Sequence, residues 1–253
     1  MSEKTQNLIY VVGLGADGQK HLTPAAREAV AHARTVLGYR PYCEQIRHIT
    51  EGKQCIASGM GEEVARAREA VERAETGEVV AVISSGDPGV YGMAGLLMEV
   101  LEEQGNTDIH VEVVPGVTAA NAAAAVLGAP LMSDFATVSL SDLLTPRQTI
   151  RRRVKAAIEG DFVTALYNPR SKNRYALLDE TLQMFARHRG SGQCAGFVRN
   201  AGRENQQRWL GTLGELPAEN VDMATIIIIG NSTTFLSNGR MIAKRGYQVE
   251  EKS

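Results

Sequence analysis

The segment Ser84–Gly92 combines residue types that could bind a ligand. It reads Ser-Ser-Gly-Asp-Pro-Gly-Val-Tyr-Gly and follows Val79–Ile83, an uninterrupted apolar run typical of a parallel strand covered on both faces. Open α/β sheets bind ligands at the carboxyl ends of such strands. Glycine and proline fix the backbone path, and the carboxylate of Asp87 could accept hydrogen bonds from ligand hydroxyl or amino groups. An ordinary Asp-Pro turn is the alternative.

A second loop has the same arrangement after the next predicted strand, Val111–Val114. Its sequence is Val-Pro-Gly-Val-Thr-Ala over Val114–Ala119, and Thr118 stands at a helix entrance as a cap or a ligand contact. Two rigid loops after successive strands favour a binding crevice over two unrelated turns.

The segment Gly13–Gly18 matches the G-x-G-x-x-G pattern of dinucleotide-binding proteins. In that motif the third glycine opens a helix, but the helix signal here begins at Thr23 and Pro24. The acidic residue expected about 20 residues further on is also missing, because the second candidate strand ends at Leu37-Gly38-Tyr39. We therefore favour a glycine loop for another ligand over nicotinamide binding or a simple turn.

These loops must be held by alternating strands and helices, which predicts a parallel α/β fold. A Gly-Ala-Pro segment precedes a predicted boundary near Leu131–Asp134, which gives domains 1–132 and 133–253. In the second domain, a capping box at Thr145–Gln148 predicts a helix toward Glu159. The remaining predicted elements are strands Leu8–Val12, Phe162–Tyr167, Cys194–Val198, Arg208–Thr212 and Thr225–Ile229, and helices Glu62–Glu75, Ala94–Gln104, Ala119–Leu127 and Tyr175–Ala186.

Composition excludes several classes of protein. The 253 residues are 43% hydrophobic and 22% charged, with a formal net charge of −2, so no global field attracts nucleic acid or an anionic membrane. The apolar run Leu8–Val12 is too short for a signal sequence or a membrane span, and we expect a cytoplasmic protein. Cys43, Cys55 and Cys194 lack C-x-x-C spacing, which favours free structural thiols and predicts no metal site.

Five blocks in order resemble the tetrapyrrole (corrin/porphyrin) methyltransferase family, over roughly Leu8 to Tyr247. They are the first glycine loop, Ser85–Gly92, Pro115–Pro130, Ser139–Pro146 with Leu166–Ser171, and Val221–Asn231. The last two are similar to the branch that methylates carbon 17 of precorrin-3B and contracts the ring. One departure is Gly15-Ala16-Asp17-Gly18, where relatives usually carry Gly-x-Gly-Pro-Gly.

The resemblance implies two α/β domains with a cleft between them, S-adenosylmethionine as methyl donor and a tetrapyrrole as substrate. The donor would leave as S-adenosylhomocysteine. It also implies a homodimer. The residues that it places against the donor are Ala16, Gly86, Asp87, Val90, Tyr91, Thr118, Ala119, Leu166, Tyr167, Asn168, Asn200, Thr225 and Ile226.

The substrate that the resemblance implies is a macrocycle with several carboxylates, and we expect cations at the mouth of the cleft to pair with them. Our candidates for substrate contacts are Arg40, Ser139, Lys172, Arg174 and Arg199, while Arg151-Arg152-Arg153 is interpreted as an exposed helix face. Tyr42 and Tyr167 could line the face of the macrocycle or pack in the core.

Ring contraction needs a base, for which Asp142, Asp87 and His21 are candidates. Three alternatives remain open: a cobalt-precorrin-3 substrate of the oxygen-independent route, an RNA or protein methyltransferase of the same fold, and a nucleotide-binding or oxidoreductase domain. Between the two tetrapyrroles, we slightly favour the metal-free one.

Overall fold

The computed structural model describes residues 7–17, 19–105, 108–171 and 175–248, and the chain divides into two compact units, residues 1–119 and 120–253. The elements of the first unit are β1 Leu8–Gly13, α1 Pro24–His32, β2 Thr35–Tyr39, α2 Arg40–Gln45, the 3-10 turn η1 Arg47–Ile49, β3 Gln54–Ser58, α3 Glu63–Glu75, β4 Val79–Ser84, α4 Met93–Glu103 and β5 His110–Val114. Of these, α2, η1 and β3 were not predicted.

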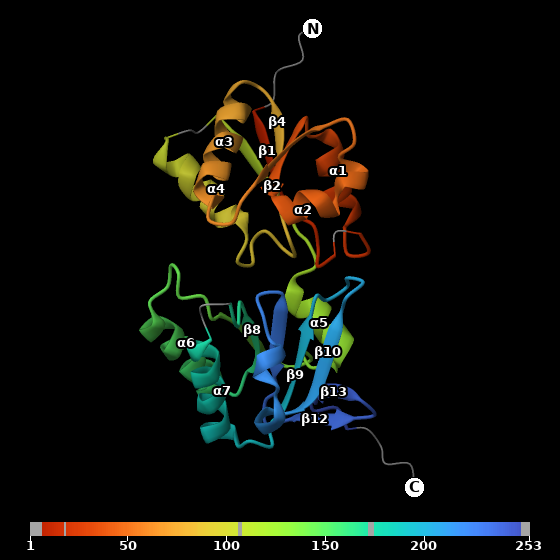
Figure 1. Cartoon of the computed structure of the whole chain (residues 1–253), viewed down its shortest axis with the longest axis vertical. Helices are drawn as coiled ribbons and strands as arrows, with labels where there is room; N and C mark the ends of the chain where they lie inside the picture. Colours follow the sequence, from red (N-terminus) through yellow and green to blue (C-terminus); the bar gives the residue numbers. More distant parts are fainter. Residues whose placement is uncertain (1–6, 18, 106–107, 172–174, 249–253) are drawn as a thin grey trace. The chain divides into compact units, whose positions relative to one another are not determined.

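The sheet of the first unit is entirely parallel, with the order β3-β2-β4-β1-β5. Alternate residues of a strand point to opposite faces. Val11 and Val82 therefore pack with α3 and α4, whereas Val12 and Ile83 pack with α1 and α2. Figure 1 shows these helix pairs on the two faces of the sheet. This double cover explains the uninterrupted apolar run of β4 and confirms the predicted α/β fold.

Helix α1 begins as its sequence predicts. The hydroxyl of Thr23 accepts a hydrogen bond from the N–H of Ala26 at 3.1 Å, and Pro24 occupies the first helical turn. Because α1 begins at Pro24, ten residues separate it from the last residue of β1, Gly13. The glycine motif therefore does not open a helix, which agrees with the argument against a dinucleotide fingerprint.

The second unit contains α5 Ala119–Leu127, β6 Gly128–Ala129, β7 Phe135–Ser139, α6 Arg147–Glu159, β8 Val163–Tyr167, α7 Ala176–Arg189, β9 Cys194–Arg199, β10 Gln207–Thr212, η2 Leu213–Glu215, η3 Ala218–Asn220, β11 Thr225–Ile229, β12 Thr234–Ser237 and β13 Arg240–Ala243. Its main sheet has the order β10-β9-β11-β8-β7. Helices α6 and α7 bury one face of it around Ile150, Leu178 and Phe185.

The sheet of this unit is mixed: only β7 and β8 are parallel, while β11 is antiparallel to both β8 and β9, and β10 is antiparallel to β9. One prediction for this unit was wrong. The capping box at Thr145 does not form, because the residue before α6 is Pro146, and no side chain caps that helix. Strands β6, β12 and β13 were not predicted.

The division between the units falls at Ala119 and Ala120, ahead of the predicted boundary at 132 and 133. Helix α5 joins the second unit because β6, which follows it directly, pairs with β13, and Leu127 reaches Gly196 of β9. The Gly-Ala-Pro segment thus ends α5 but lies within the second unit.

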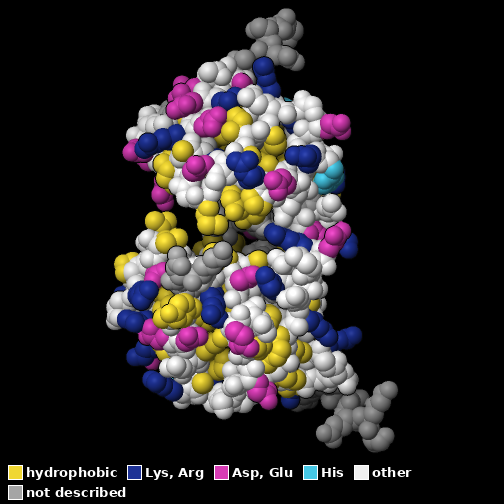
Figure 2. Space-filling view, viewed as in Figure 1, with side chains coloured by type: hydrophobic (Ala, Val, Ile, Leu, Met, Phe, Trp, Pro, Cys, Tyr) yellow, Lys and Arg dark blue, Asp and Glu magenta, His cyan; other side chains and the backbone are white. Residues whose placement is uncertain are grey.

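None of the helices in the described ranges has the length and apolar character needed to cross a membrane. On the face of the molecule in Figure 2, cationic and anionic side chains are interspersed over each unit, in keeping with the small net charge.

Candidate functional site

Two loops of the first unit are joined where β1 and β4 end. The N–H of Leu14 donates to the carbonyl of Ser84 at 2.8 Å. Gly15 and Gly86 then exchange two backbone hydrogen bonds of 3.0 and 2.8 Å. Both glycines have positive φ, 69° and 66°, which residues with a Cβ rarely adopt. The glycine loop and the Ser84–Gly92 loop are therefore one structural unit.

Asp87 connects the third loop, Val114–Ala119, to this pair. Its Oδ1 accepts from the N–H of Gly89 at 2.8 Å, and its Oδ2 accepts from the N–H of Gly116 at 3.1 Å. A Cβ at Gly116 would lie 2.1 Å from the carbonyl oxygen of Gly86, so only glycine allows this approach. The three loops singled out in the sequence thus meet at the carboxyl edge of one sheet.

The unusual Ala16-Asp17 sequence closes the first loop by side-chain hydrogen bonds. Asp17 Oδ1 accepts from the N–H groups of Gln19 and His21, each at 3.0 Å, and lies 3.3 Å from His21 Nδ1. Burial alone would raise the pKa of Asp17, but these N–H groups and the His21 side chain outweigh it and lower that pKa. Ala16 is buried beside this turn. Sequence reasoning missed Asp17 as the organiser of the loop, although an Asp two residues before a backbone N–H is a known turn signal.

The other predicted donor contacts of this unit lie on the same three loops. Val90 is half-buried, and Tyr91 is 52% exposed with a φ of 55°. Thr118 and Ala119 are half-buried, and they approach Gly86, where a Cβ would lie 3.6 Å from Thr118 Cα and Ala119 N. The structure therefore brings all seven first-unit donor candidates onto one connected loop cluster.

The donor candidates of the second unit also gather at one sheet edge. The β-sheet register pairs Leu166 with Ile227 and Arg199 with Thr225, so the ends of β8 and β9 lie beside the start of β11. Asn168 and Asn200 follow directly, with φ values of 49° and 52°, a conformation that Asn tolerates better than most residues. Leu166, Tyr167, Asn168, Asn200, Thr225 and Ile226 are thus neighbours.

Two of these side chains are engaged in structural hydrogen bonds. The hydroxyl of Tyr167 accepts from the buried N–H of Ala120 at 2.9 Å and so attaches β8 to α5. Thr225 Oγ1 donates to Asp222 Oδ1 at 2.9 Å and accepts from the N–H of Asp222 at 3.1 Å. Asp222 was not singled out in the sequence. A turn-forming Asp just before a strand could have indicated it.

The substrate and catalytic candidates have varied surroundings. Asn168 Nδ2 donates to Ser139 Oγ at 3.0 Å, and Arg199 Nε lies 2.7 Å from Asp222 Oδ2, so Arg199 forms an ion pair within the second unit. Arg147 Nε donates to Asp142 Oδ2 at 2.6 Å. Arg40 is exposed at the start of α2 and half-buried Tyr42 packs edge-on against Tyr39, whereas Lys172 and Arg174 lie outside the described residues.

The three candidate bases, His21, Asp87 and Asp142, each have a partner within the protein. The choice of base therefore stays a prediction.

Arg151, in the triplet interpreted as an exposed helix face, forms an ion pair with Glu180 of α7, with Nε 2.7 Å from Oε1.

Within the part of the chain that the structure describes, no group of three or more His, Cys, Asp and Glu side chains could hold a metal ion. The three cysteines are free thiols.

The fold and this loop cluster match a known family. The chain belongs to the tetrapyrrole (corrin/porphyrin) methylase family, whose pattern it matches over residues 8–217. The family resemblance inferred from the motifs is thereby confirmed.

Individual relatives have narrower names. The chain is 45% identical, over 96% of its length and 100% of the relative, to a probable cobalt-factor III C(17)-methyltransferase of Salmonella typhimurium. It is 41% identical, over 89% of both chains, to the precorrin-3B C(17)-methyltransferase of a Sinorhizobium species.

Solved structures agree. The crystal structure of the methyltransferase CobJ is 35% identical and superposes with a TM-score of 0.89, covering 94% of this chain and 99% of that one. The uroporphyrin-III C-methyltransferase of Thermus thermophilus, crystallised with S-adenosylhomocysteine, is 24% identical with a TM-score of 0.65, over 88% of this chain and 96% of that one, and supports the fold alone.

Proposed function

We propose that the chain transfers a methyl group from S-adenosylmethionine to carbon 17 of a precorrin-3B-type tetrapyrrole, with contraction of the ring to the precorrin-4 level. The observation that carries this proposal is the match to C(17)-methyltransferases along nearly their whole lengths. The hydrogen-bonded loop cluster at the carboxyl edge of the first sheet adds a physical reason, because such an edge is where α/β folds hold their ligands.

The first-unit loops suit a donor that carries hydroxyl and amino groups. Each oxygen of the Asp87 carboxylate accepts one backbone hydrogen bond, at 2.8 and 3.1 Å, and an ionised carboxylate oxygen can accept a second. Gly86 has positive φ and no side chain, and a Cβ there would lie 3.6 Å from Thr118 Cα, so the two loops approach each other closely beside Asp87. We assign donor contacts here to Ala16, Gly86, Asp87, Val90, Tyr91, Thr118 and Ala119.

The donor supplies an electrophilic methyl group on a sulfonium, and methyl transfer to carbon is an in-line displacement that needs positioning more than a protein nucleophile. Rigid loops supply such positioning. The close contacts at Gly116 and the paired hydrogen bonds of Gly15 and Gly86 fix the loops before any ligand arrives.

In the second unit, we assign donor contacts to Leu166, Tyr167, Asn168, Asn200, Thr225 and Ile226, and substrate contacts to Ser139 and Arg199. Their support is that they share one sheet edge and that Asp222 holds both Arg199 and Thr225. Arg40 is the substrate cation proposed in the first unit, because no described acidic side chain forms an ion pair with it.

Calorimetry tests the donor assignment against the nucleotide-binding alternative. We expect S-adenosylhomocysteine to bind and NAD not to bind. Binding of NAD alone would reject the proposal, whereas donor binding without methylation of a tetrapyrrole would favour an RNA or protein methyltransferase of this fold.

The form of the tetrapyrrole is the second question. The chain is 45% identical to a relative named for cobalt-factor III and 41% identical to one named for precorrin-3B. Both tetrapyrroles must therefore be compared as substrates. Incubation of the protein with donor and each tetrapyrrole, followed by mass measurement of the added methyl group and the absorption spectrum of the contracted ring, identifies the substrate. Methylation of neither compound would reject the proposed reaction.

We further propose that the protein is a cytoplasmic homodimer. The three free thiols suit a reducing compartment, and closed two-fold dimers are the commonest oligomers of soluble proteins. Light scattering measures the oligomeric state, and a monomer mass would reject the dimer.

A further inference from the structure

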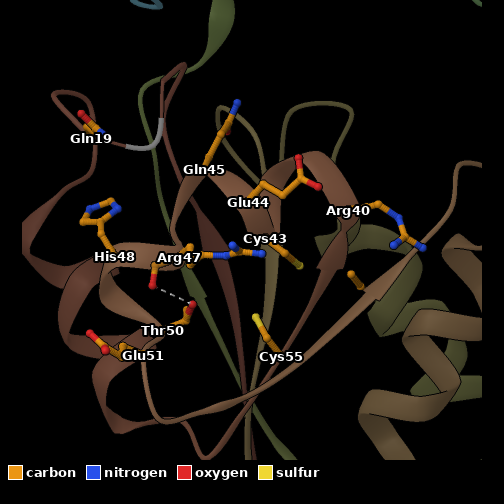
Figure 3. Close-up of a pocket in the computed structure, with 11 residues that line it drawn as sticks. Gln19, Arg40, Cys43, Glu44, Gln45, Arg47, His48, Thr50, Glu51 and Cys55 are labelled. Carbon is orange, nitrogen blue, oxygen red and sulfur yellow. Dashed lines mark hydrogen bonds between the residues drawn. The ribbon is translucent and has the colours of Figure 1, made fainter.

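The first unit has a cavity of about 780 Å³. Of the residues that line it, only Arg40 has a role in the methyl-transfer proposal. It is lined mainly by α2, η1 and β3, and Gln19 of the first loop completes the lining. Figure 3 shows charged and polar side chains around it, together with two thiols, Cys43 from α2 and Cys55 from β3. Two cysteines on the wall of one cavity prompt the question of what they can do together.

The sheet register places the two thiols on the same face. Cys55 pairs with Val36 across β3 and β2, and directly paired residues of neighbouring strands point to the same side. Cys43 packs in the cluster that contains Val36, and its Sγ lies 3.2 Å from where a Cβ on Gly38 would be. Both thiols line the same cavity, and Cys55 is near enough to raise the pKa of Cys43. The two thiols therefore lie on the same face of the sheet, on the wall of one cavity.

The two thiols differ in accessibility. Cys43 is 8% exposed, whereas Cys55 is exposed on the edge strand of its sheet. Burial, and then contact with Cys55, raise the pKa of Cys43 to about 12, so Cys43 stays protonated at neutral pH. Cys55 is accordingly the thiol that an external reagent meets first.

A buried cation lies at the end of β3. Arg66 is 5% exposed, and its guanidinium donates to Ser58 Oγ at 2.7 Å, to the carbonyl of Gly59 at 3.1 Å and to Met93 Sδ at 3.6 Å. No ion pair joins it to an acidic side chain in the described parts of the chain. Its charge lowers the pKa of Cys43 against the larger effect of burial.

We propose that Cys43 and Cys55 form a thiol–disulfide exchange site for low-molecular-weight disulfides of the glutathione type. The thiolate of Cys55 attacks one sulfur of glutathione disulfide, the sulfur–sulfur bond breaks, and one glutathione leaves as a thiolate. Cys43 then gives up its proton and attacks the Cys55 sulfur, and the second glutathione leaves. The protein dithiol is oxidised by two electrons, the disulfide is reduced to two glutathiones, and these take up the two thiol protons.

The product is a cross-link between α2 and β3 across the cavity wall. Because Arg40 is the first residue of α2 and lines the same cavity, the cross-link fixes the helix that carries a proposed substrate cation. The exchange site itself does not depend on the methyl-transfer proposal and is tested without donor or tetrapyrrole.

The experiment treats the full chain with glutathione disulfide, blocks remaining thiols by alkylation and measures the intact mass. The wild-type protein should lose two hydrogen atoms and keep one alkylatable thiol, Cys194, and peptide mapping should join Cys43 to Cys55. Dithiothreitol should restore three thiols.

Single variants separate the two roles. Cys43→Ser should stop at one glutathione on Cys55, Cys55→Ser should form no adduct over the same time, and Cys194→Ser should cross-link like the wild type. If Cys43→Ser is unstable, Cys43→Ala serves in its place. A wild-type protein that accumulates the glutathione adduct without an internal cross-link, or that joins Cys194 to either residue, would overturn the proposal.

Discussion

The Asp87 carboxylate accepts a hydrogen bond from the backbone N–H of Gly116, with Oδ2 3.1 Å from N, and so joins the loop after β4 to the loop after β5. The other oxygen, Oδ1, holds the N–H of Gly89 within its own loop. One side chain therefore sets the spacing of two loops that we assign to donor binding.

Replacing Asp87 by Ala should weaken donor binding. The substitution removes one charge-assisted hydrogen bond between the loops and one within the Ser84–Gly92 loop, so the two loops lose their shared anchor. We expect the affinity for S-adenosylhomocysteine to fall at least about tenfold, which corresponds to roughly 1.4 kcal/mol, as measured by calorimetry. Asp134→Ala, at an exposed position, is the matched control and should bind like the wild type. Unchanged binding by Asp87→Ala would remove Asp87 from the donor site.

Gly116→Ala tests the close approach of the same loops. A Cβ at this position would lie 2.1 Å from the carbonyl oxygen of Gly86 and 2.9 Å from the backbone of Gly13, and backbone cannot move away cheaply. We expect the free energy of unfolding to fall by about 1–3 kcal/mol, with weaker donor binding.

Gly95→Ala provides the control for Gly116→Ala. Gly95 lies in α4, and a Cβ there meets no atom within 4 Å. Alanine favours a helix over glycine by about 1 kcal/mol, so this variant should be as stable as the wild type or more so. Urea denaturation measures both variants. Equal stability of Gly116→Ala and the wild type would mean that the loops can separate without cost.

Acid should destabilise the first loop through Asp17. Its folded-state pKa is lowered, because backbone N–H groups and His21 outweigh the effect of burial, so the folded protein holds the ionised form more strongly than the unfolded chain does. The resulting stabilisation is fully present above the unfolded pKa of about 3.9, and it is lost as pH falls through the lower folded value.

The measurement is the free energy of unfolding as a function of pH in the wild type and Asp17→Asn. The variant should show a shallower loss of stability below about pH 4. Asp108→Asn, at an exposed position, should follow the wild-type curve. Parallel curves for Asp17→Asn and the wild type would contradict the assigned role of Asp17.

The sequence predicted the first unit well because its signals are local. Thr23 and Pro24 define the start of α1, and the apolar run of β4 reports burial on both faces. The loop residues Gly86, Asp87 and Thr118 could also be singled out, since each lies in a loop that follows a predicted strand. Short-range patterns of this kind need no knowledge of the partner strands.

Long-range features escaped prediction. An apolar run such as Thr225–Ile229 does not encode strand direction, so the antiparallel placement of β11 between β8 and β9 could not be inferred. The pairing of Arg199 with Asp222 and the placement of Cys43 near Cys55 depend on tertiary packing between residues that are separated in sequence. The boundary after Ala119 depends on the pairing of β6 with β13.

Tyr167→Phe tests whether the second unit relies on a single hydroxyl to hold α5. The Tyr167 side chain is 7% exposed, and its hydroxyl accepts from the buried N–H of Ala120 at 2.9 Å. Phenylalanine keeps the ring but leaves that N–H without this partner, so the free energy of unfolding should fall by about 1–3 kcal/mol in urea denaturation. Tyr10→Phe is the matched control, because it removes an exposed hydrogen bond to His32 and should change stability by no more than about 0.5 kcal/mol. If the two variants were equally stable, α5 would be held by its apolar contacts rather than by the Tyr167 hydroxyl.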